Sequence, residues 1–240
     1  MSTTHRVLVP IELPDGDPVP PVLVDALATM EAVALGHYGL PEQTPPSAGR
    51  DQFEADAADE LNDLAQPFNS ADIPVTTRLV FGKARDKTIN RVAVEERCDV
   101  ILTPGRVETV EQVAVPLRGE SNFDRITSLA GELLSATDAS VTLFHASEAS
   151  DRLPGEDILA DATDRLIEAG VAPDRISQQL SEDDDVSRSI VELGEDFDVL
   201  VLGETEPSLR DRILGTVPAQ VTADTENPAF VVRNVEDVEA

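Results

Sequence analysis

The loop after the most apolar segment of the chain carries the residue types that hold phosphate groups. Asp198-Val-Leu-Val-Leu-Gly203 is a continuous apolar run that ends at a glycine, and a polar loop leads from it to Gly215 and Thr216. Glycines let backbone N–H groups approach a phosphate closely, and a hydroxyl adds a further donor. An apolar run bounded by glycine predicts a strand buried on both faces of a parallel sheet. Since open α/β sheets bind ligands outside the carboxyl ends of their strands, this loop is the first candidate for a binding site.

The same residues have a structural interpretation, which the sequence favours. Gly203 then only ends a strand, and Thr216 is the N-cap of the last helix. His37 and His145 stand at equivalent places in two similar strands, but no further ligand stands at a metal-binding spacing, so we interpret both as strand-end residues. The single cysteine, Cys98, is expected to be a packed thiol. No nucleophile elbow, P-loop or paired-histidine motif occurs, so the sequence makes no positive case for an enzyme.

Strand and helix patterns alternate along the chain. Short apolar runs predict strands, and apolar residues at helical spacing predict the helices between them. This alternation gives right-handed βαβ units, and therefore an α/β fold with parallel sheets. The predicted strands are residues 6–12, 32–37, 75–81, 99–103, 113–118, 141–145, 176–180, 198–202 and 229–233, and the main predicted helices are 53–68, 89–96, 126–134, 158–169, 186–193 and 217–224.

The order of elements occurs twice, and short motifs recur with it. Val7-Leu-Val-Pro-Ile-Glu12 matches Val113-Ala-Val-Pro-Leu-Arg118, and Asp99-Val-Ile-Leu-Thr103 matches Asp198-Val-Leu-Val-Leu202. After Thr103, only about ten residues precede the next repeat, which is too few for a crossover helix and a further strand. The first repeat is therefore predicted to lack the last helix and strand. The two predicted domains are residues 1–110 and 111–240.

Four features of the two repeats stand out: the Val-Pro first strand, the Leu-x-His close of the second, the Asp-Val-Leu-Val-Leu-Gly fourth strand, and Gly-Thr followed by Pro-Ala-Phe-Val-Val-Arg. Together they resemble the universal stress protein family, in the tandem, two-repeat form of haloarchaeal type. The resemblance implies two Rossmann-like, parallel-sheet units of the adenine nucleotide alpha hydrolase-like type, the first truncated. It also implies a protein that is usually dimeric.

Family members that bind ATP have an Asp at the end of the first strand and a Gly-x-x-Gly-x(9)-Gly-Ser/Thr loop after the fourth. By resemblance, Glu12 and Arg118 take the Asp position in the two repeats, and Gly203, Gly215 and Thr216 take the outer positions of the loop. The middle glycine is replaced by glutamate, the loop is one residue short, and arginine cannot accept a hydrogen bond. The first repeat has no room for the loop. The resemblance thus implies a degenerate nucleotide site, with ATP and magnesium as the candidate ligands, or an ion pair between Glu12 and Arg118.

The charge of the chain excludes some partners. The net charge is −29, and only Lys83 and Lys87 are lysines. Nucleic acids and anionic membranes bind clustered cations, so neither is expected as a partner. Acidic residues spread through amphipathic segments predict a surface for multimolar salt, in the cytosol of a halophile. With a single cysteine and no apolar run of about 20 residues, we expect a cytoplasmic protein without direct membrane insertion.

Three hypotheses for the function stay open. The first is a non-catalytic stress-response or regulatory protein with weak or lost nucleotide binding. The second is an ATP-binding switch with slow hydrolysis that uses Glu12 or the loop from Gly203 to Thr216. The third is a soluble regulatory partner of a membrane transporter, by analogy with the family alone. A homodimer is also expected, because the last strand occurs once and leaves an edge for a second chain.

Overall fold

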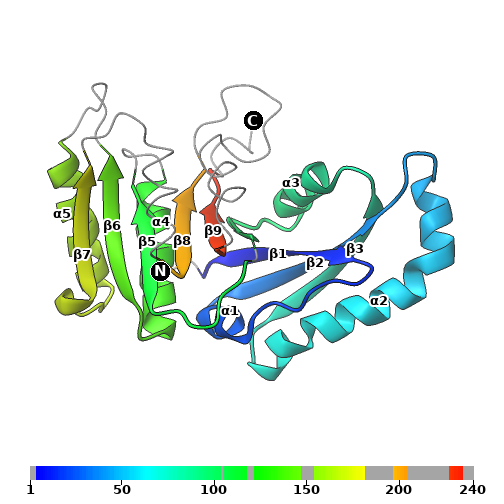
Figure 1. Cartoon of the computed structure of the whole chain (residues 1–240), viewed down its shortest axis with the longest axis horizontal. Coiled ribbons are helices and arrows are strands. Elements are labelled where there is room, and N and C mark those ends of the chain that lie inside the picture. Colours follow the sequence, from blue (N-terminus) through cyan, green and yellow to red (C-terminus); the bar gives the residue numbers. More distant parts are fainter. Residues whose placement is uncertain are drawn as a thin grey trace. The chain divides into compact units, whose positions relative to one another are not determined.

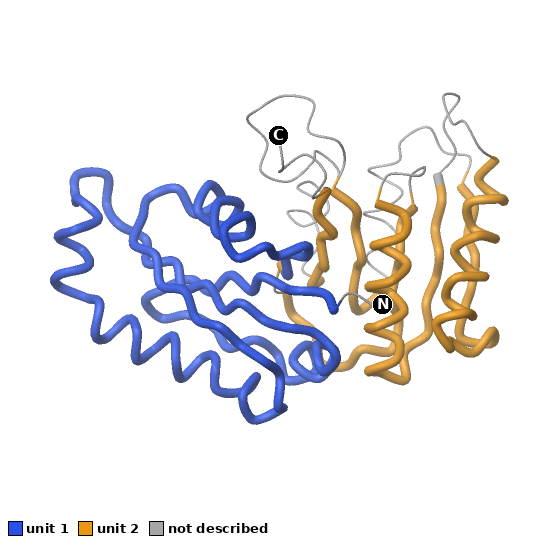
Figure 2. The backbone as a smooth tube through the Cα atoms, turned by 180° about the vertical axis from the view of Figure 1, so that it is seen from behind, with its two compact units in different colours: residues 1–102 blue, residues 103–240 orange. Residues whose placement is uncertain are grey.

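The chain forms two compact units. The computed structural model describes residues 4–103, 105–117, 122–146, 154–181, 197–204 and 227–234. Residues 1–102 make up unit 1 and residues 103–240 make up unit 2, shown in blue and orange in Figure 2. These limits follow packing, whereas the predicted limits at residues 110 and 111 follow the sequence repeat, and that assignment of domains stays a prediction.

Unit 1 is a parallel sheet with the strand order β3-β2-β1-β4. Its two central strands are buried along most of their length because helices cover both faces. Helix α2 packs on one face and α3 on the other (Figure 1). The elements are β1 (Arg6–Leu13), α1 (Pro21–Ala26), β2 (Glu31–Gly39), α2 (Pro46–Ser70), β3 (Val75–Gly82), α3 (Arg85–Glu95) and β4 (Val100–Thr103).

Helix α2 is longer than the predicted helix over residues 53–68, which was wrong at both ends. It starts at Pro46, where proline loses nothing because the first N–H groups of a helix have no intrahelical partner. It continues through Pro67, which the sequence analysis took as a limit. Pro67 lies in the last turn, so it disturbs little of the helix, and the next residue, Phe68, is fully buried in the core.

Unit 2 is a parallel sheet with the strand order β7-β6-β5-β8-β9. Helices α4 and α5 pack beside one another on one face of it (Figure 2). The elements are β5 (Gln112–Pro116), α4 (Phe123–Ala136), β6 (Ser140–Ala146), α5 (Gly155–Glu168), a 3₁₀ turn (Pro173–Arg175), β7 (Ile176–Ser181), β8 (Val199–Gly203) and β9 (Ala229–Val232).

The predicted α/β class with parallel sheets is confirmed. In each unit the first strand lies between the second and the fourth, and unit 2 adds β9 beyond β8. Among the described residues of unit 1 there is no counterpart of β9, in agreement with a truncated first half. The helices predicted over residues 186–193 and 217–224 lie outside the described residues.

The acidic residue that opens each matched strand has the same structural task in both units. In unit 1 the carboxylate of Asp99 accepts the backbone N–H of Arg6 at 2.8 Å and lies 2.6 Å from Nδ1 of His5. In unit 2 the carboxylate of Asp198 accepts the N–H groups before and at the start of β5, at 2.8 and 2.9 Å. Each aspartate therefore ties the start of one strand to the start of its neighbour.

Candidate functional site

The carboxyl edge of the unit 1 sheet brings a carboxylate and an imidazole together on one face. Glu12 of β1 is opposite His37 of β2, and His37 is opposite Val80 of β3. Because side chains alternate between the faces of a sheet, His37 shares its face with Leu35, which packs against α3. The polar groups at this edge thus lie on the side of the sheet that α3 covers.

The amino end of α3 lies over this edge. The helix starts at Arg85 after an N-cap residue, Ala84, that offers no side-chain hydrogen bond. The hydroxyl of Thr88 donates to the carbonyl of Ala84 at 3.0 Å. The N–H groups of the first turn have no intrahelical acceptor and point out of the helix end, where the helix dipole is positive. Nε of Arg85 lies 3.7 Å from Oε2 of Glu12, so the two form an ion pair that is too long for a hydrogen bond.

His37 is the most unusual residue of this edge. Its side chain is 2% exposed, and neither ring nitrogen has a hydrogen-bond partner among the described residues. A Cβ built on Gly82 would lie 3.6 Å from Nε2 of His37 and 3.5 Å from Oγ1 of Thr88, so Nε2 faces the first turn of α3. Burial, followed by the positive charge of Arg85, lowers the pKa of His37, against the opposing effects of Glu12 and Asp86.

The two histidines are not equivalent, and the sequence-based match between them was wrong. Pro10 is opposite Leu35 in unit 1, whereas the matching Pro116 is opposite Phe144 in unit 2. The counterpart of His145 is therefore a glycine, one residue before His37. A shift of one residue places a side chain on the other face of the sheet. Accordingly, His145 packs against Gly155 at the start of α5, and its Nδ1 lies 3.0 Å from the carbonyl oxygen of Leu117.

The five residues of the predicted nucleotide site are divided between the units. Glu12 is in unit 1, with its side chain 68% exposed beside Arg85. Gly203 ends β8 in unit 2. The remaining three, Arg118, Gly215 and Thr216, lie outside the described residues, and so does any ion pair between Glu12 and Arg118.

Gly203 has a packing role that the sequence did not reveal. A Cβ at this position would lie 2.8 Å from Cδ1 of Ile126 on α4, and 3.8 Å from its next nearest atom. The missing side chain therefore lets α4 approach the end of β8. Directly after it, the carboxylate of Glu204 accepts the backbone N–H of Asn234 at 2.9 Å. A negative charge is thus fixed at the carboxyl end of β8.

This packing role predicts a specific pair of effects. Gly203→Ala should destabilise the protein by roughly 1–3 kcal/mol, as overpacked cores do. Ile126→Val removes only the atom that would be struck, and alone should cost about 0.5–1.5 kcal/mol. In the Ile126→Val background, Gly203→Ala should cost much less, which denaturant unfolding of the four proteins measures. Strictly additive effects would contradict the packing role.

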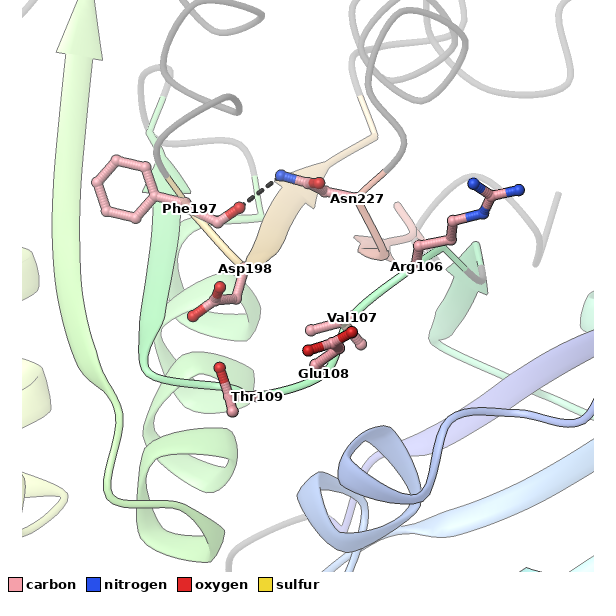
Figure 3. Close-up of a pocket in the computed structure, with 7 residues that line it drawn as sticks. All are labelled: Arg106, Val107, Glu108, Thr109, Phe197, Asp198 and Asn227. Carbon is pink, nitrogen blue, oxygen red and sulfur yellow. Dashed lines mark hydrogen bonds between the residues drawn. The ribbon is translucent and has the colours of Figure 1, made fainter.

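A polar pocket of about 300 Å³ lies at the opposite, amino end of the unit 2 sheet (Figure 3). Two of the residues that line the pocket have structural roles. The carboxylate of Asp198 binds backbone N–H groups, as Asp99 does in unit 1, and the side-chain amide of Asn227 donates to the carbonyl of Phe197. Arg106 extends away from Asp198. No sequence motif pointed to this pocket, which is lined by Arg106, Val107, Glu108, Thr109, Phe197, Asp198 and Asn227.

Three other features were considered as candidates for function: the single cysteine, a metal site and a membrane-spanning helix. Cys98 is fully buried, and burial raises the pKa of its thiol to about 11, as expected for a packed residue. In the described part of the chain, no three His, Cys, Asp or Glu side chains are grouped so as to hold a metal ion. None of the described helices is both long and apolar enough to cross a membrane.

The association of Glu12, His37 and Arg85 was missed by the sequence analysis. One signal was present. The segment Lys83-Ala-Arg85-Asp-Lys87 contains both lysines of the chain and an arginine within five positions, although the net charge is −29. Such a local cluster of cations in an acidic chain indicates that the start of α3 is a candidate functional region.

Comparison with known proteins identifies the fold. Neither a protein-family model nor a curated protein sequence matches the chain. The crystal structure of a universal stress protein from Archaeoglobus fulgidus matches 97% of this chain and 97% of its own, with a TM-score of 0.67 and 13% identity. A functionally unknown protein from Pseudomonas aeruginosa matches 99% of this chain and 95% of its own, with a TM-score of 0.58 and 15% identity. The cytoplasmic domain of a prokaryotic cation chloride cotransporter matches 99% and 98%, with a TM-score of 0.52 and 9% identity. Over nearly its whole length, this chain has the fold of the universal stress proteins.

Proposed function

We propose that this chain is a non-catalytic regulatory protein of the universal stress type, which acts in the cytoplasm during stress and has a degenerate nucleotide site. The observation that carries the proposal is the position of Glu204. Its carboxylate is held at the carboxyl end of β8 by the N–H of Asn234. Backbone cradles hold phosphates with N–H donors and positive potential, so a fixed carboxylate there opposes an ATP triphosphate.

Unit 1 supports the same proposal. Glu12, which takes the place of the Asp that contacts the nucleoside, is engaged with Arg85. Only eight residues, 104–111, separate β4 from β5, and this length is too short for the phosphate loop of the family pattern. Neither unit therefore offers a nucleotide both a nucleoside contact and a phosphate loop.

Titration of ATP with magnesium tests the proposal. We expect no saturable heat by calorimetry, and no shift in thermal stability, in about 2 M KCl, where surface charge is screened. Glu204→Gln serves as the matched variant, because it removes the charge and keeps an acceptor for Asn234. Weak binding that appears only in this variant would support the role given to the carboxylate.

The opposite result favours the ATP-binding switch. Saturable binding of ATP and magnesium by the wild-type protein, lost on Thr216→Ala, would revive the loop from Gly203 to Thr216 as a phosphate cradle. Slow ATP hydrolysis by the same protein would then make it a weak ATPase. Either result would overturn the proposal of a degenerate site.

A second candidate is a regulatory partner of a membrane transporter. The observation that favours it is the shared fold of the cotransporter's cytoplasmic domain, which covers 99% of this chain. Copurification with membranes from the native source would favour this candidate over a free regulatory protein. For either role we propose a homodimer, which light scattering in molar salt would detect.

A further inference from the structure

We propose that the carboxyl edge of unit 1 binds a small phosphate-type oxyanion, held between the imidazole of His37 and the amino end of α3. The site shares Glu12 with the predicted nucleotide site. It uses neither Gly203 nor the loop after β8, so the inference does not require that ATP binds there.

The first argument is the condition of His37. A buried imidazole has at least one N–H donor and normally finds an acceptor, because an unpaired buried polar group is costly. His37 is only 2% exposed, and neither of its ring nitrogens has a hydrogen-bond partner among the described residues. The buried histidine of unit 2, His145, does have such a neighbour, since the carbonyl oxygen of Leu117 lies 3.0 Å from its Nδ1. A ligand atom between Nε2 and α3 would supply what His37 lacks.

The second argument is the helix that faces this imidazole. Helix α3 has 11 residues, and its N-cap residue, Ala84, makes no side-chain cap at the amino end. Its first-turn N–H groups and its dipole favour an anion at this end. Nε of Arg85 has no hydrogen bond to any described residue and lies 3.7 Å from Oε2 of Glu12, so it is a further donor at the same edge.

The third argument is the space beside Gly82. A Cβ at this position would stand at ordinary contact distances of 3.6 Å from Nε2 of His37 and 3.5 Å from Oγ1 of Thr88. The backbone at Gly82 thus leaves room for one atom of oxygen or carbon size next to the imidazole and the first turn. A small ligand oxygen fits such a place.

The carboxylate of Glu12 narrows the class of anion. It lies at the rim, opposite His37 in the strand register. A fully deprotonated anion would be repelled by it, whereas an oxyanion that keeps a proton can donate to it. Hydrogen phosphate meets this condition near neutral pH, and a phosphate monoester meets it in its singly protonated form, below a second pKa of about 6. Sulfate does not meet it.

The test uses four full-length proteins titrated with inorganic phosphate, glycerol 3-phosphate and sulfate by calorimetry in molar KCl. The decisive variant is Gly82→Ala, which should fold normally but fill the space. Its matched control is Gly39→Ala at the end of the neighbouring strand, where a Cβ would meet nothing within 4 Å. His37→Leu removes the imidazole and leaves the apolar packing.

We expect the wild-type protein and Gly39→Ala to bind a phosphate group saturably, and more tightly than sulfate. Gly82→Ala and His37→Leu should each bind at least about tenfold more weakly. A preference for the monoester over inorganic phosphate would identify a phosphorylated metabolite as the natural source, and the reverse would identify free phosphate. Absence of phosphate binding, or equal binding by all four proteins, would overturn the proposal and leave His37 paired with water alone.

Discussion

In dilute buffer the protein should unfold, and it should regain its fold in about 2 M KCl. The physical reason is the net charge of −29, from 47 acidic and 18 basic residues. At low ionic strength, carboxylates repel one another across distances of a domain, and this repulsion acts against the compact state. At 1 M salt the Debye length is about 3 Å, so only neighbouring charges still interact.

The structure shows that local ion pairs do not remove this excess of acid. Arginines already share their charge among several acids, as Arg78 does with Glu95 at 3.2 Å and Glu96 at 3.1 Å. These pairs are partly or largely exposed, and exposed pairs contribute about 0–1 kcal/mol each. They cannot offset the repulsion among the acids that have no basic partner.

Circular dichroism as a function of KCl concentration measures this effect. The matched variant replaces four exposed acids of α2 by amides, namely Asp51→Asn, Asp56→Asn, Asp59→Asn and Asp63→Asn. This change should move the folding midpoint to lower salt without altering the folded spectrum. A wild-type protein that unfolds cooperatively, at an ordinary temperature, in buffer without added salt would contradict the prediction.

The sequence predicted the fold because the buried strands are nearly continuous apolar runs. Segments such as Asp99-Val-Ile-Leu-Thr103 and Asp198-Val-Leu-Val-Leu202 can form little other than doubly covered strands, and their repetition fixes the same strand order in both units. The end of α2 was predicted less well. A proline near a helix end weakens the helix only slightly, and burial of Phe68 outweighs that effect.

The candidate site could be predicted only in part, for two physical reasons. First, a strand buried on both faces has no alternation of polar and apolar residues, so the sequence does not tell which face a residue takes. His37 and His145 were matched by residue type, although one residue of register separates them and they lie on opposite faces. Second, the pairing of Glu12 with Arg85 joins residues far apart in the chain, through the packing of α3, which no local pattern encodes.

Loss of the Asp99 carboxylate should strongly destabilise unit 1. Asp99→Ala leaves two donors, the N–H of Arg6 and the ring of His5, without their acceptor. Each unsatisfied, partly buried donor costs about 1–3 kcal/mol, so we expect a loss of roughly 2–4 kcal/mol in the free energy of unfolding. Unit 2 offers the control, since Asp198 has the same role in an exposed setting. There water can replace the carboxylate, and Asp198→Ala should cost less.

The same contact makes stability depend on pH in the acid range. Burial raises the pKa of Asp99, but the hydrogen bonds from His5 and from the N–H of Arg6 outweigh it, so the pKa lies below its ordinary value of 3.8. A carboxylate with a lowered folded pKa stabilises the protein fully above its unfolded pKa, and the contribution is lost as the pH falls through the folded pKa. In molar KCl, the difference in unfolding free energy between the wild type and Asp99→Asn should thus be constant above about pH 5 and should shrink below pH 4. Parallel curves down to acid unfolding would show that the charge of Asp99 contributes nothing, and that only its hydrogen-bond geometry matters.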